Sequence, residues 1–171
     1  MRIAFSIVCV LAGVAVFAAP AWGSPGTLDR SFDGDGKVLT NFATASSEET
    51  FAVALQRNGR IVVAGRARVG GRWQLAIARY RESGNLDPTF DGDGKVLTDV
   101  SATSDEEARA LAVQPDGKIV VAGFGGTGDG SRLVLARYRE NGSLDPTFGT
   151  GGIVVTDLPS ATSEQAFALA L

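Results

Sequence analysis

The chain has 171 residues, with 16 basic and 19 acidic side chains, no His and a single Cys, Cys9. A formal net charge of −3 provides no basic surface for nucleic acid or for anionic membranes. The absence of His excludes Ser-His and Cys-His catalytic pairs and the usual zinc sites that need His. The length suits one ordinary domain.

The N-terminal residues have the pattern of an export signal. Arg2 precedes an apolar stretch from Ile3 to Ala19, and the small residues Ala19-Pro20-Ala21-Trp22-Gly23 follow. We predict a signal peptide over 1–23 with cleavage after Gly23, or alternatively after Ala21. An uncleaved anchor is disfavoured because the apolar run is at the lower limit for a membrane span. Cleavage leaves 15 basic and 19 acidic residues, a net charge of −4, and no Cys. The predicted location is extracytoplasmic, either secreted or in the cell envelope, with no membrane association after cleavage.

A 58-residue repeat governs the rest of the chain. The motif Leu28–Phe32 recurs at Leu86–Phe90 and at Leu144–Phe148, and 31 of the 58 positions of 28–85 and 86–143 are identical. The sequence therefore divides into a first unit with its N-terminal lead-in (24–85), a second unit (86–143) and a third (144–171). The third unit stops after 28 residues, and we expect it to be a truncated unit.

Each unit contains four segments with strand character. In the first unit they are Lys37–Thr40, Phe51–Gln56, Arg60–Gly65 and Gln74–Tyr80. Asn58-Gly59, or Asp116-Gly117 in the second unit, predicts a hairpin whose two central positions both have positive φ. No segment has a convincing helical period.

Consecutive apolar residues in two of these segments predict how the sheets pack. Ile61–Ala64 and Leu75–Ala78 have no polar interruption, which indicates that both faces of these strands are buried. We therefore predict an all-β fold of tandem four-stranded antiparallel blades, β-propeller-like and incomplete. About two and a half units are fewer than the four blades that a closed propeller needs.

The ordered motifs of the second unit resemble those of the delta-60 repeat of bacterial exported proteins. They are Leu86–Phe90, Gly94-Lys95-Val96, Gln114–Gly123 and Leu135–Tyr138. The resemblance implies a β-propeller-like repeat array, usually within a larger protein. It implies no activity, because the family is defined by its repeat.

Two acidic patterns suggest chemistry. Asp33-Gly34-Asp35-Gly36 recurs at 91–94 and suggests calcium, but the EF-hand spacing is not met and the third unit has Gly149-Thr150-Gly151-Gly152. We favour a turn and predict no metal site and no cofactor. Glu48-Glu49 recurs as Glu106-Glu107 and as Glu164-Gln165, and adjacent residues on a strand point to opposite faces. We therefore favour a solvated strand entry over a catalytic pair.

Two further patterns concern structure and binding. Recurrence of both partners suggests that Arg79 and Arg137 pair with Asp87 and Asp145. The loop where the units differ most is the candidate binding site, since repeat proteins vary loops on their binding face. Its candidate partner-binding residues are Arg66, Arg68, Arg72, Trp73, Phe124 and Asp129. An alternative for Trp73 is packing over its own hairpin.

These observations favour a non-enzymatic, exported repeat module that acts as a binding or structural scaffold, with no catalytic residue in the chain. We expect a protein or carbohydrate ligand, and contacts with further repeat units or with other copies of the chain. The alternatives are a non-catalytic part of a larger propeller hydrolase and a calcium-stabilised repeat array.

Overall fold

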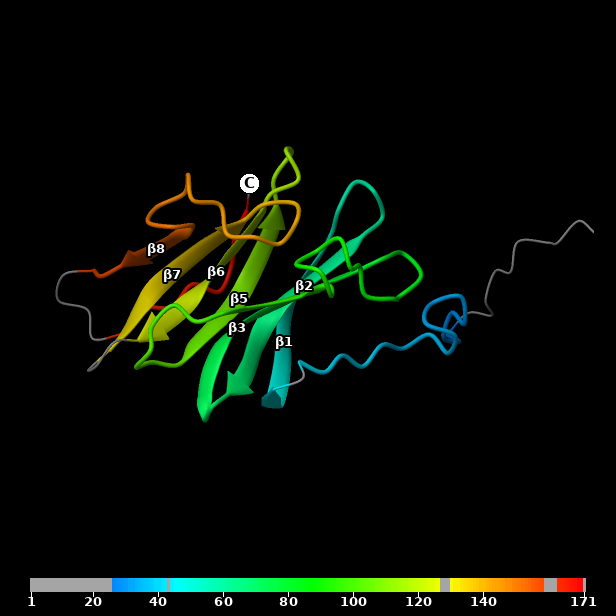
Figure 1. Cartoon of the computed structure of the whole chain (residues 1–171), viewed down its shortest axis with the longest axis horizontal. Coiled ribbons are helices and arrows are strands. Elements are labelled where there is room, and N and C mark those ends of the chain that lie inside the picture. The colour runs from blue at the N-terminus through cyan, green and yellow to red at the C-terminus, as the bar shows by residue number, and fades with distance from the viewer. Residues whose placement is uncertain (1–25, 43, 127–129, 159–162, 171) are drawn as a thin grey trace, which may run out of the picture.

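The computed structural model describes residues 26–42, 44–126, 130–158 and 163–170, so the predicted signal peptide lies outside the described residues. The described part contains strands, turns and loops but no α-helix (Figure 1). Two antiparallel four-stranded sheets form its body. The first sheet contains, in spatial order, β1 (Ala45–Leu55), β2 (Ile61–Val69), β3 (Arg72–Tyr80) and β4 (Lys95–Thr98). The second contains β5 (Glu106–Val113), β6 (Ile119–Gly126), β7 (Ser131–Tyr138) and β8 (Ile153–Thr156).

The sheets are out of phase with the sequence repeat. β4 follows the Leu86–Phe90 motif and so belongs to the second unit, yet it pairs with β3 of the first unit. The amide of Asp87 donates to the carbonyl of Arg79 at 2.9 Å, which returns the chain along the free edge of β3. Four strands per sheet are confirmed, but the assignment of all four strands of a unit to one sheet was wrong. Each sheet takes its fourth strand from the next unit.

Both first strands contain a β-bulge at the same unit position. The register shifts between Thr50 and Ala52 in β1 and between Ala108 and Ala110 in β5, which leaves Phe51 and Arg109 as the extra residues. The facing residue of β6 is Gly123, and a Cβ there would overlap the carbonyl oxygen of Glu107. Glycine is therefore required beside the bulge.

The predicted hairpin between the first two strands is confirmed, but its turn is wider than expected. The amide of Gln56 donates to the carbonyl of Arg60 at 2.8 Å, and Gly59 has a φ of 77°. Asn58 is not among the residues with positive φ. Its side chain instead accepts a hydrogen bond from the amide of Arg60 at 3.2 Å. The Asn side chain thus stabilises the loop without entering the left-handed region.

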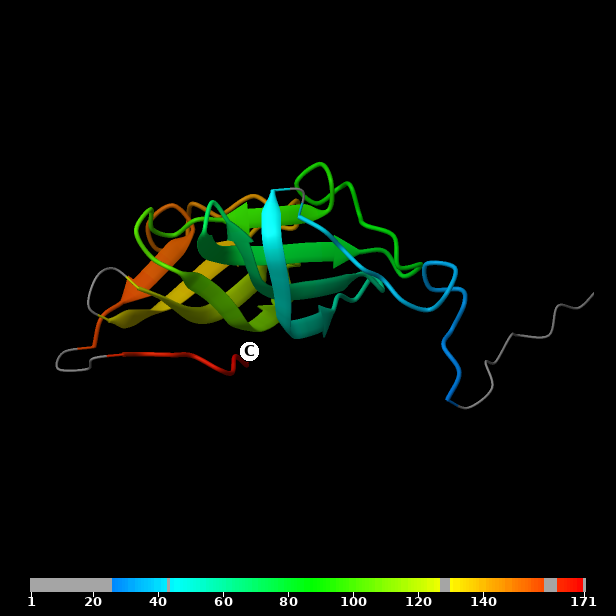
Figure 2. The same cartoon turned by 90° about the horizontal axis from the view of Figure 1, so that it is seen from below.

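The main hydrophobic core lies between the two sheets. It joins Val62 and Leu75 of the first sheet to Ile119, Val121 and Tyr138 of the second, all of them buried. The predicted burial of both strand faces is confirmed for Leu75–Ala78, each at most 6% exposed, but it was wrong for Ile61–Ala64, where Ile61 and Val63 are only partly buried. The equivalent residues 119–122 of β6 are each less than 9% exposed. The first sheet covers the face of β6 that carries Ile119 and Val121 (Figure 2).

The chain on either side of the two sheets lies where strands of neighbouring units would lie. The Thr40 hydroxyl contacts the Tyr80 hydroxyl at 2.5 Å, as Thr98 of β4 contacts Tyr138 at 2.7 Å. Lys37–Thr40, predicted as a strand, has the sequence of β4 but forms no strand. At the other end, the amide of Glu164 donates to the carbonyl of Ser131 at 2.9 Å. Figure 2 shows this last segment in red, running beside the second sheet.

Candidate functional site

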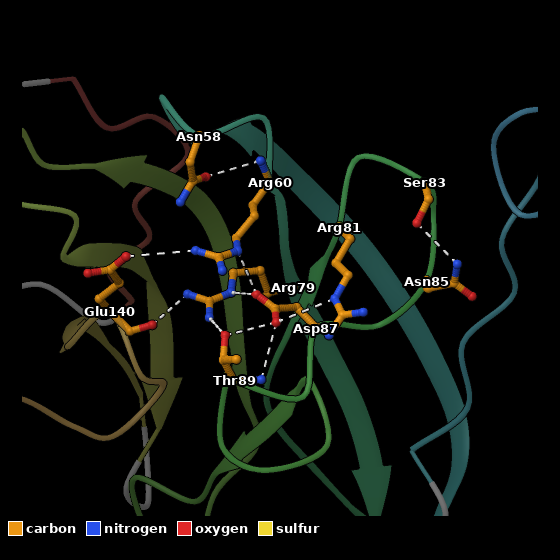
Figure 3. A network of polar contacts seen from close by, with 9 residues as sticks. All are labelled: Asn58, Arg60, Arg79, Arg81, Ser83, Asn85, Asp87, Thr89 and Glu140. Carbon is orange, nitrogen blue, oxygen red and sulfur yellow. Dashed lines mark hydrogen bonds and ion pairs between the residues drawn. The ribbon is translucent and has the colours of Figure 1, made fainter.

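A buried polar network joins the first sheet to the turn that leads into β4 (Figure 3). The Nε atom of Arg79 donates to Oδ2 of Asp87 at 2.9 Å, and both side chains are 1% exposed. Arg60 reaches the same carboxylate at 2.8 Å, and Thr89 donates its hydroxyl to Oδ1 at 2.8 Å. Arg79 also donates to the carbonyl of Glu140, which lies two residues after the end of β7 in the second sheet. The predicted Arg–Asp pairing is therefore confirmed, and it also links the two sheets.

The second unit repeats this pairing in a more open form. Arg137 binds Asp145 at 2.9 Å, and its side chain is 18% exposed. Burial alone would raise the pKa of Asp87, but hydrogen bonds from Thr89 and the charges of Arg79 and Arg60 outweigh it and lower the pKa. Hydrogen bonds from Thr147 likewise lower the pKa of Asp145. Both carboxylates stay ionised and fully paired, which is a structural role.

The first glutamate of each acidic pair holds the loop before its strand. Phe42 donates its amide to Glu48 at 3.1 Å, Ser101 to Glu106 at 3.2 Å and Leu158 to Glu164 at 3.0 Å. Glu106 is 1% exposed and Glu107 is 2% exposed, so the prediction of a solvated strand entry was wrong for the second unit. Arg66 of the first sheet pairs with Glu107, whereas Ser101 and Ser104 of the preceding loop donate to Glu106. Burial raises the pKa of Glu106 to about 7, against an opposing hydrogen bond from Ser104.

In the first two units, the second glutamate of the pair binds an arginine that is shared between the sheets. Arg66 of β2 donates to Glu49 on the neighbouring strand at 2.9 Å and to Glu107 of the second sheet at 2.6 Å. Its guanidinium carbon lies 4.1 Å from the centre of the Trp73 ring. Glu107 also pairs with Arg109 of its own strand. Two positive and two negative groups thus balance one another at the boundary between the sheets.

The bulge residues complete this group. The guanidinium carbon of Arg109 lies 4.1 Å from the Phe51 ring and 5.9 Å from the rings of Phe124 and Phe167. Phe51, Arg109 and Phe167 occupy the same position in three successive units. We call the whole set the bulge cluster, and its members are Glu49, Phe51, Arg66, Trp73, Glu107, Arg109, Phe124 and Phe167. Phe167 is 64% exposed and the other aromatic rings are partly exposed, so the cluster has an accessible surface.

The residues predicted to bind a partner separate into two groups. Arg66, Trp73 and Phe124 belong to the bulge cluster, where Trp73 stacks on an arginine of its own hairpin. Arg68 donates to the carbonyl of Gly71 at 3.2 Å, and Arg72 donates to Asp99 at 3.1 Å and to the carbonyl of Ser101 at 2.8 Å. These two arginines stabilise loops. Asp129 lies outside the described residues.

Sequence reasoning missed five of the eight members of the bulge cluster, namely Phe51, Arg109 and Phe167 and the two glutamates that pair with arginines. The sequence did contain a signal. Positions 51, 109 and 167 are equivalent in the repeat, and Arg replaces Phe at 109 although the residues on either side are closely similar in all three units. Only a register that places a bulge there distinguishes this variation from ordinary surface drift.

The Asp-Gly-Asp-Gly segments form turns. Asp33 and Asp91 have φ near 50°, and the second Asp of each segment accepts a hydrogen bond from the amide of the following Lys at 2.8 Å. Within the described residues no three acidic, His or Cys side chains come close enough to hold a metal ion. In the same part of the chain, no helix is long and apolar enough to cross a membrane.

Two face-to-face four-stranded sheets, each completed by a strand of the next unit, define an all-β repeat protein of the propeller type whose sheets do not close a ring. The family model described as a domain of unknown function (DUF5122), beta-propeller, matches residues 56–90 and 114–148. The two matched stretches begin 58 residues apart, so each covers the same part of a unit. No curated protein matches the chain. These findings support a repeat family of the propeller type.

Proposed function

We propose that this chain is a non-catalytic scaffold of the propeller type that binds a ligand through the bulge cluster. One observation supports this above others: the bulge recurs in β1 and β5 beside a glycine, Gly65 or Gly123, while the residue at its tip changes from Phe51 to Arg109. Repeat proteins vary positions on their binding face and keep the residues that hold units together. The ionisable groups with shifted pKa values are instead committed to internal contacts.

The chemistry of the cluster suits an uncharged ligand that has both apolar faces and hydroxyl groups. The arginines and glutamates of the cluster neutralise each other, so a strongly charged ligand gains little there. The partly exposed Phe rings offer stacking surfaces, and the paired charges offer hydrogen-bond donors and acceptors at their rim. An oligosaccharide fits this combination best, and a protein segment is the second possibility.

Binding of the purified chain to a glycan array tests this proposal. Phe167→Ala and Phe51→Ala should each weaken binding to the selected glycan at least tenfold, because each removes a stacking surface. Leu28→Ala is the matched control, since Leu28 is 56% exposed and lies outside the cluster. Equal binding by all three variants, or binding only to peptides, would contradict the carbohydrate assignment. Turnover of ester, phosphate or glycoside substrates would contradict the non-catalytic role.

We further infer that the repeats are of the delta-60 type and that the chain is exported with removal of residues 1–23. The motif order in the second unit and the composition of the N-terminal stretch support these two inferences. N-terminal sequencing of the protein recovered outside the cytoplasm should begin at Ser24. Recovery of a chain that still begins at Met1 would overturn the inference of cleavage.

A further inference from the structure

The outer face of the first sheet is apolar and is uncovered along β1, while its β3 residues Ala76, Ala78 and Tyr80 are buried. Ala52 and Ala54 of β1 pack into the core between the sheets, so the alternate residues Val53 and Leu55 lie on the opposite face. Val53 is 66% exposed and Leu55 is 72% exposed. We call this surface the open face, and its apolar residues are Val53, Leu55, Ile61, Val63, Ala76, Ala78 and Tyr80. The leading residues Val38 and Phe42 pack against its inner part only.

The second sheet shows what normally lies against this face. The residues equivalent to Val53, Ile61 and Val63 are Leu111, Ile119 and Val121, which are 9%, 0% and 1% exposed. They are buried because the first sheet packs on them. The same unit positions are therefore an interface in one sheet and a surface in the other. Isolated exposed apolar residues need no explanation, but a patch with a buried counterpart indicates a binding surface.

The chain carries a second copy of the surface that does the covering. The residues of the first sheet that cover its neighbour are Ala52, Ala54, Val62, Ala64, Leu75 and Ile77. At the equivalent positions on the far side of the second sheet, which we call the far face, are Ala110, Ala112, Val120, Ala122, Leu133 and Leu135. Five of these six residues are identical to their counterparts, and the sixth replaces Ile with Leu. The far face is thus shaped for an open face.

We propose that the open face binds the far face of a second copy of this chain, in the same arrangement as the two sheets within one copy. The polar contacts have matching partners as well. Arg79 donates to the carbonyl of Glu140 across the existing interface, and Arg137 of one copy lies where it would donate to the carbonyl of Glu82 of the other. The new interface thereby repeats one that the molecule already uses.

Assembly requires that two segments be displaced. On the open face, Thr40 contacts Tyr80 as Thr98 of β4 contacts Tyr138, so the lead-in 37–42 lies at the place that β8 of the incoming copy would take. The stretch 163–170 lies along the second sheet at the place that β1 of the incoming copy would take. It is held by the hydrogen bond from Glu164 to Ser131 and by a contact between the hydroxyls of Ser131 and Ser163. It forms no strand, and Phe167 remains 64% exposed. A full sheet buries far more apolar area than these two segments do, so exchange favours the assembled state.

The two faces differ, so the contact is heterologous and joins copies head to tail. Such contacts form closed rings when the rotation between copies allows it and open arrays otherwise. With two sheets in each copy, rings of about two to four copies would have the four to eight blades found in propellers.

Light scattering coupled to size-exclusion chromatography of the purified chain tests the proposal. We expect the measured molar mass to be a whole multiple of the monomer mass and to decrease when the protein is diluted. Val53→Asp should give a monomer, because it places a charge at the centre of the interface while its own site is exposed in the monomer. Val155→Asp is the control, since Val155 is 47% exposed on β8 and belongs to neither face. A monomeric wild-type chain, or assembly that persists in Val53→Asp, overturns the proposal.

A mixing experiment tests which faces meet. Ala112→Asp disrupts the far face and Val53→Asp disrupts the open face, so each variant alone should be monomeric. Mixed together they retain one intact pair of faces and should form a one-to-one dimer that grows no further. A dimer of Ala112→Asp alone would show that two open faces bind each other, which overturns the head-to-tail arrangement. Circular dichroism of each variant verifies that it is folded.

Discussion

At the scale of single residues, Arg79 connects three parts of the molecule. It binds the Asp87 carboxylate, the Thr89 hydroxyl and the carbonyl of Glu140, and its guanidinium carbon lies 4.7 Å from the Phe90 ring. A buried ion pair adds little net stability compared with an apolar pair, but removing one partner leaves an uncompensated charge. The repeat provides a natural comparison, since Arg137 makes the same ion pair with more exposure.

Replacing Arg79 with Met should therefore lower the free energy of unfolding by about 3 kcal/mol, at the lower end for a broken buried pair, because Arg60 still reaches Asp87. Arg137→Met should cost less, because water reaches that site. Urea denaturation of both variants measures the difference. Equal costs would indicate that burial does not decide the strength of the pair.

Glu106 should make stability depend on pH near neutrality. Burial raises its pKa in the folded chain to about 7, above its ordinary value of 4.5. A group whose pKa is raised by folding favours the folded state when protonated, so its contribution is present below pH 4.5 and is lost as the pH rises through 7. Urea midpoints should fall between about pH 5 and pH 8, and Glu106→Gln should flatten this dependence. An unchanged slope in Glu106→Gln would assign the dependence to other groups.

The sequence predicted the pairing of Arg79 with Asp87 but not the burial of Glu106 and Glu107. Arg79 and Asp87 are eight residues apart, and both recur after 58 residues, so their pairing could be predicted without knowing the sheet order. The burial of Glu106 and Glu107 could not be predicted, because it depends on how the loop before β5 folds over Glu106 and on Arg66 of the neighbouring sheet, which pairs with Glu107. Alternation along a strand indicates opposite faces but not what lies against each face.

At the scale of strands, the bulge and its facing glycine form one unit of structure. The extra residue pushes the carbonyl of Glu107 toward β6, so only glycine fits at position 123. Gly117 is required for another reason, since its φ of 84° is unfavourable for other residues although a Cβ would have room.

Gly123→Ala should cost roughly 3 kcal/mol, as for overpacking of a filled interior. Gly117→Ala should cost about 1 kcal/mol, which is the typical penalty for a side chain in the left-handed region. Thermal unfolding of the two variants should therefore show a clearly larger loss for Gly123→Ala. The reverse order would mean that the backbone of β5 moves to accept the methyl group.

The sequence also could not show that each sheet takes its fourth strand from the next unit, because this too depends on contacts with distant residues. Lys37–Thr40 and Lys95–Thr98 are identical tetrapeptides, yet only the second forms a strand, because only it has a sheet before it. The bulge was equally hidden, since an extra residue in a strand leaves the spacing of repeats unchanged. Strand number and hairpin positions were predicted correctly because they depend on neighbouring residues alone.

At the scale of the whole molecule, the two sheets share one core and should unfold together. Val134 of β7 is 2% exposed and packs in that core. Val134→Ala should therefore destabilise both sheets, by roughly 2 kcal/mol. Fluorescence of Trp73 reports on the first sheet alone once residues 1–23 are removed. Its unfolding midpoint should shift with that of circular dichroism, and a shift in only one signal would show that the sheets unfold independently.

Calcium should have no effect at this scale. The second Asp of each Asp-Gly-Asp-Gly turn, Asp35 or Asp93, is engaged with a backbone amide and with the neighbouring lysine. Melting temperatures with added calcium and with a chelator should therefore agree. A rise with calcium that Asp91→Asn abolishes would revive the calcium-stabilised array.

The phase offset between sheet and sequence unit has a consequence for how such chains change length. Wherever a 58-residue insertion is made in the array, the inserted residues give the preceding sheet its fourth strand. The sheet that they add then takes its own fourth strand from the unit that follows. Duplication by unequal recombination therefore does not have to begin at a structural boundary to yield a foldable product. In evolution, gain or loss of whole repeats is then a mutation that leaves every existing hydrogen-bonded pair of strands intact.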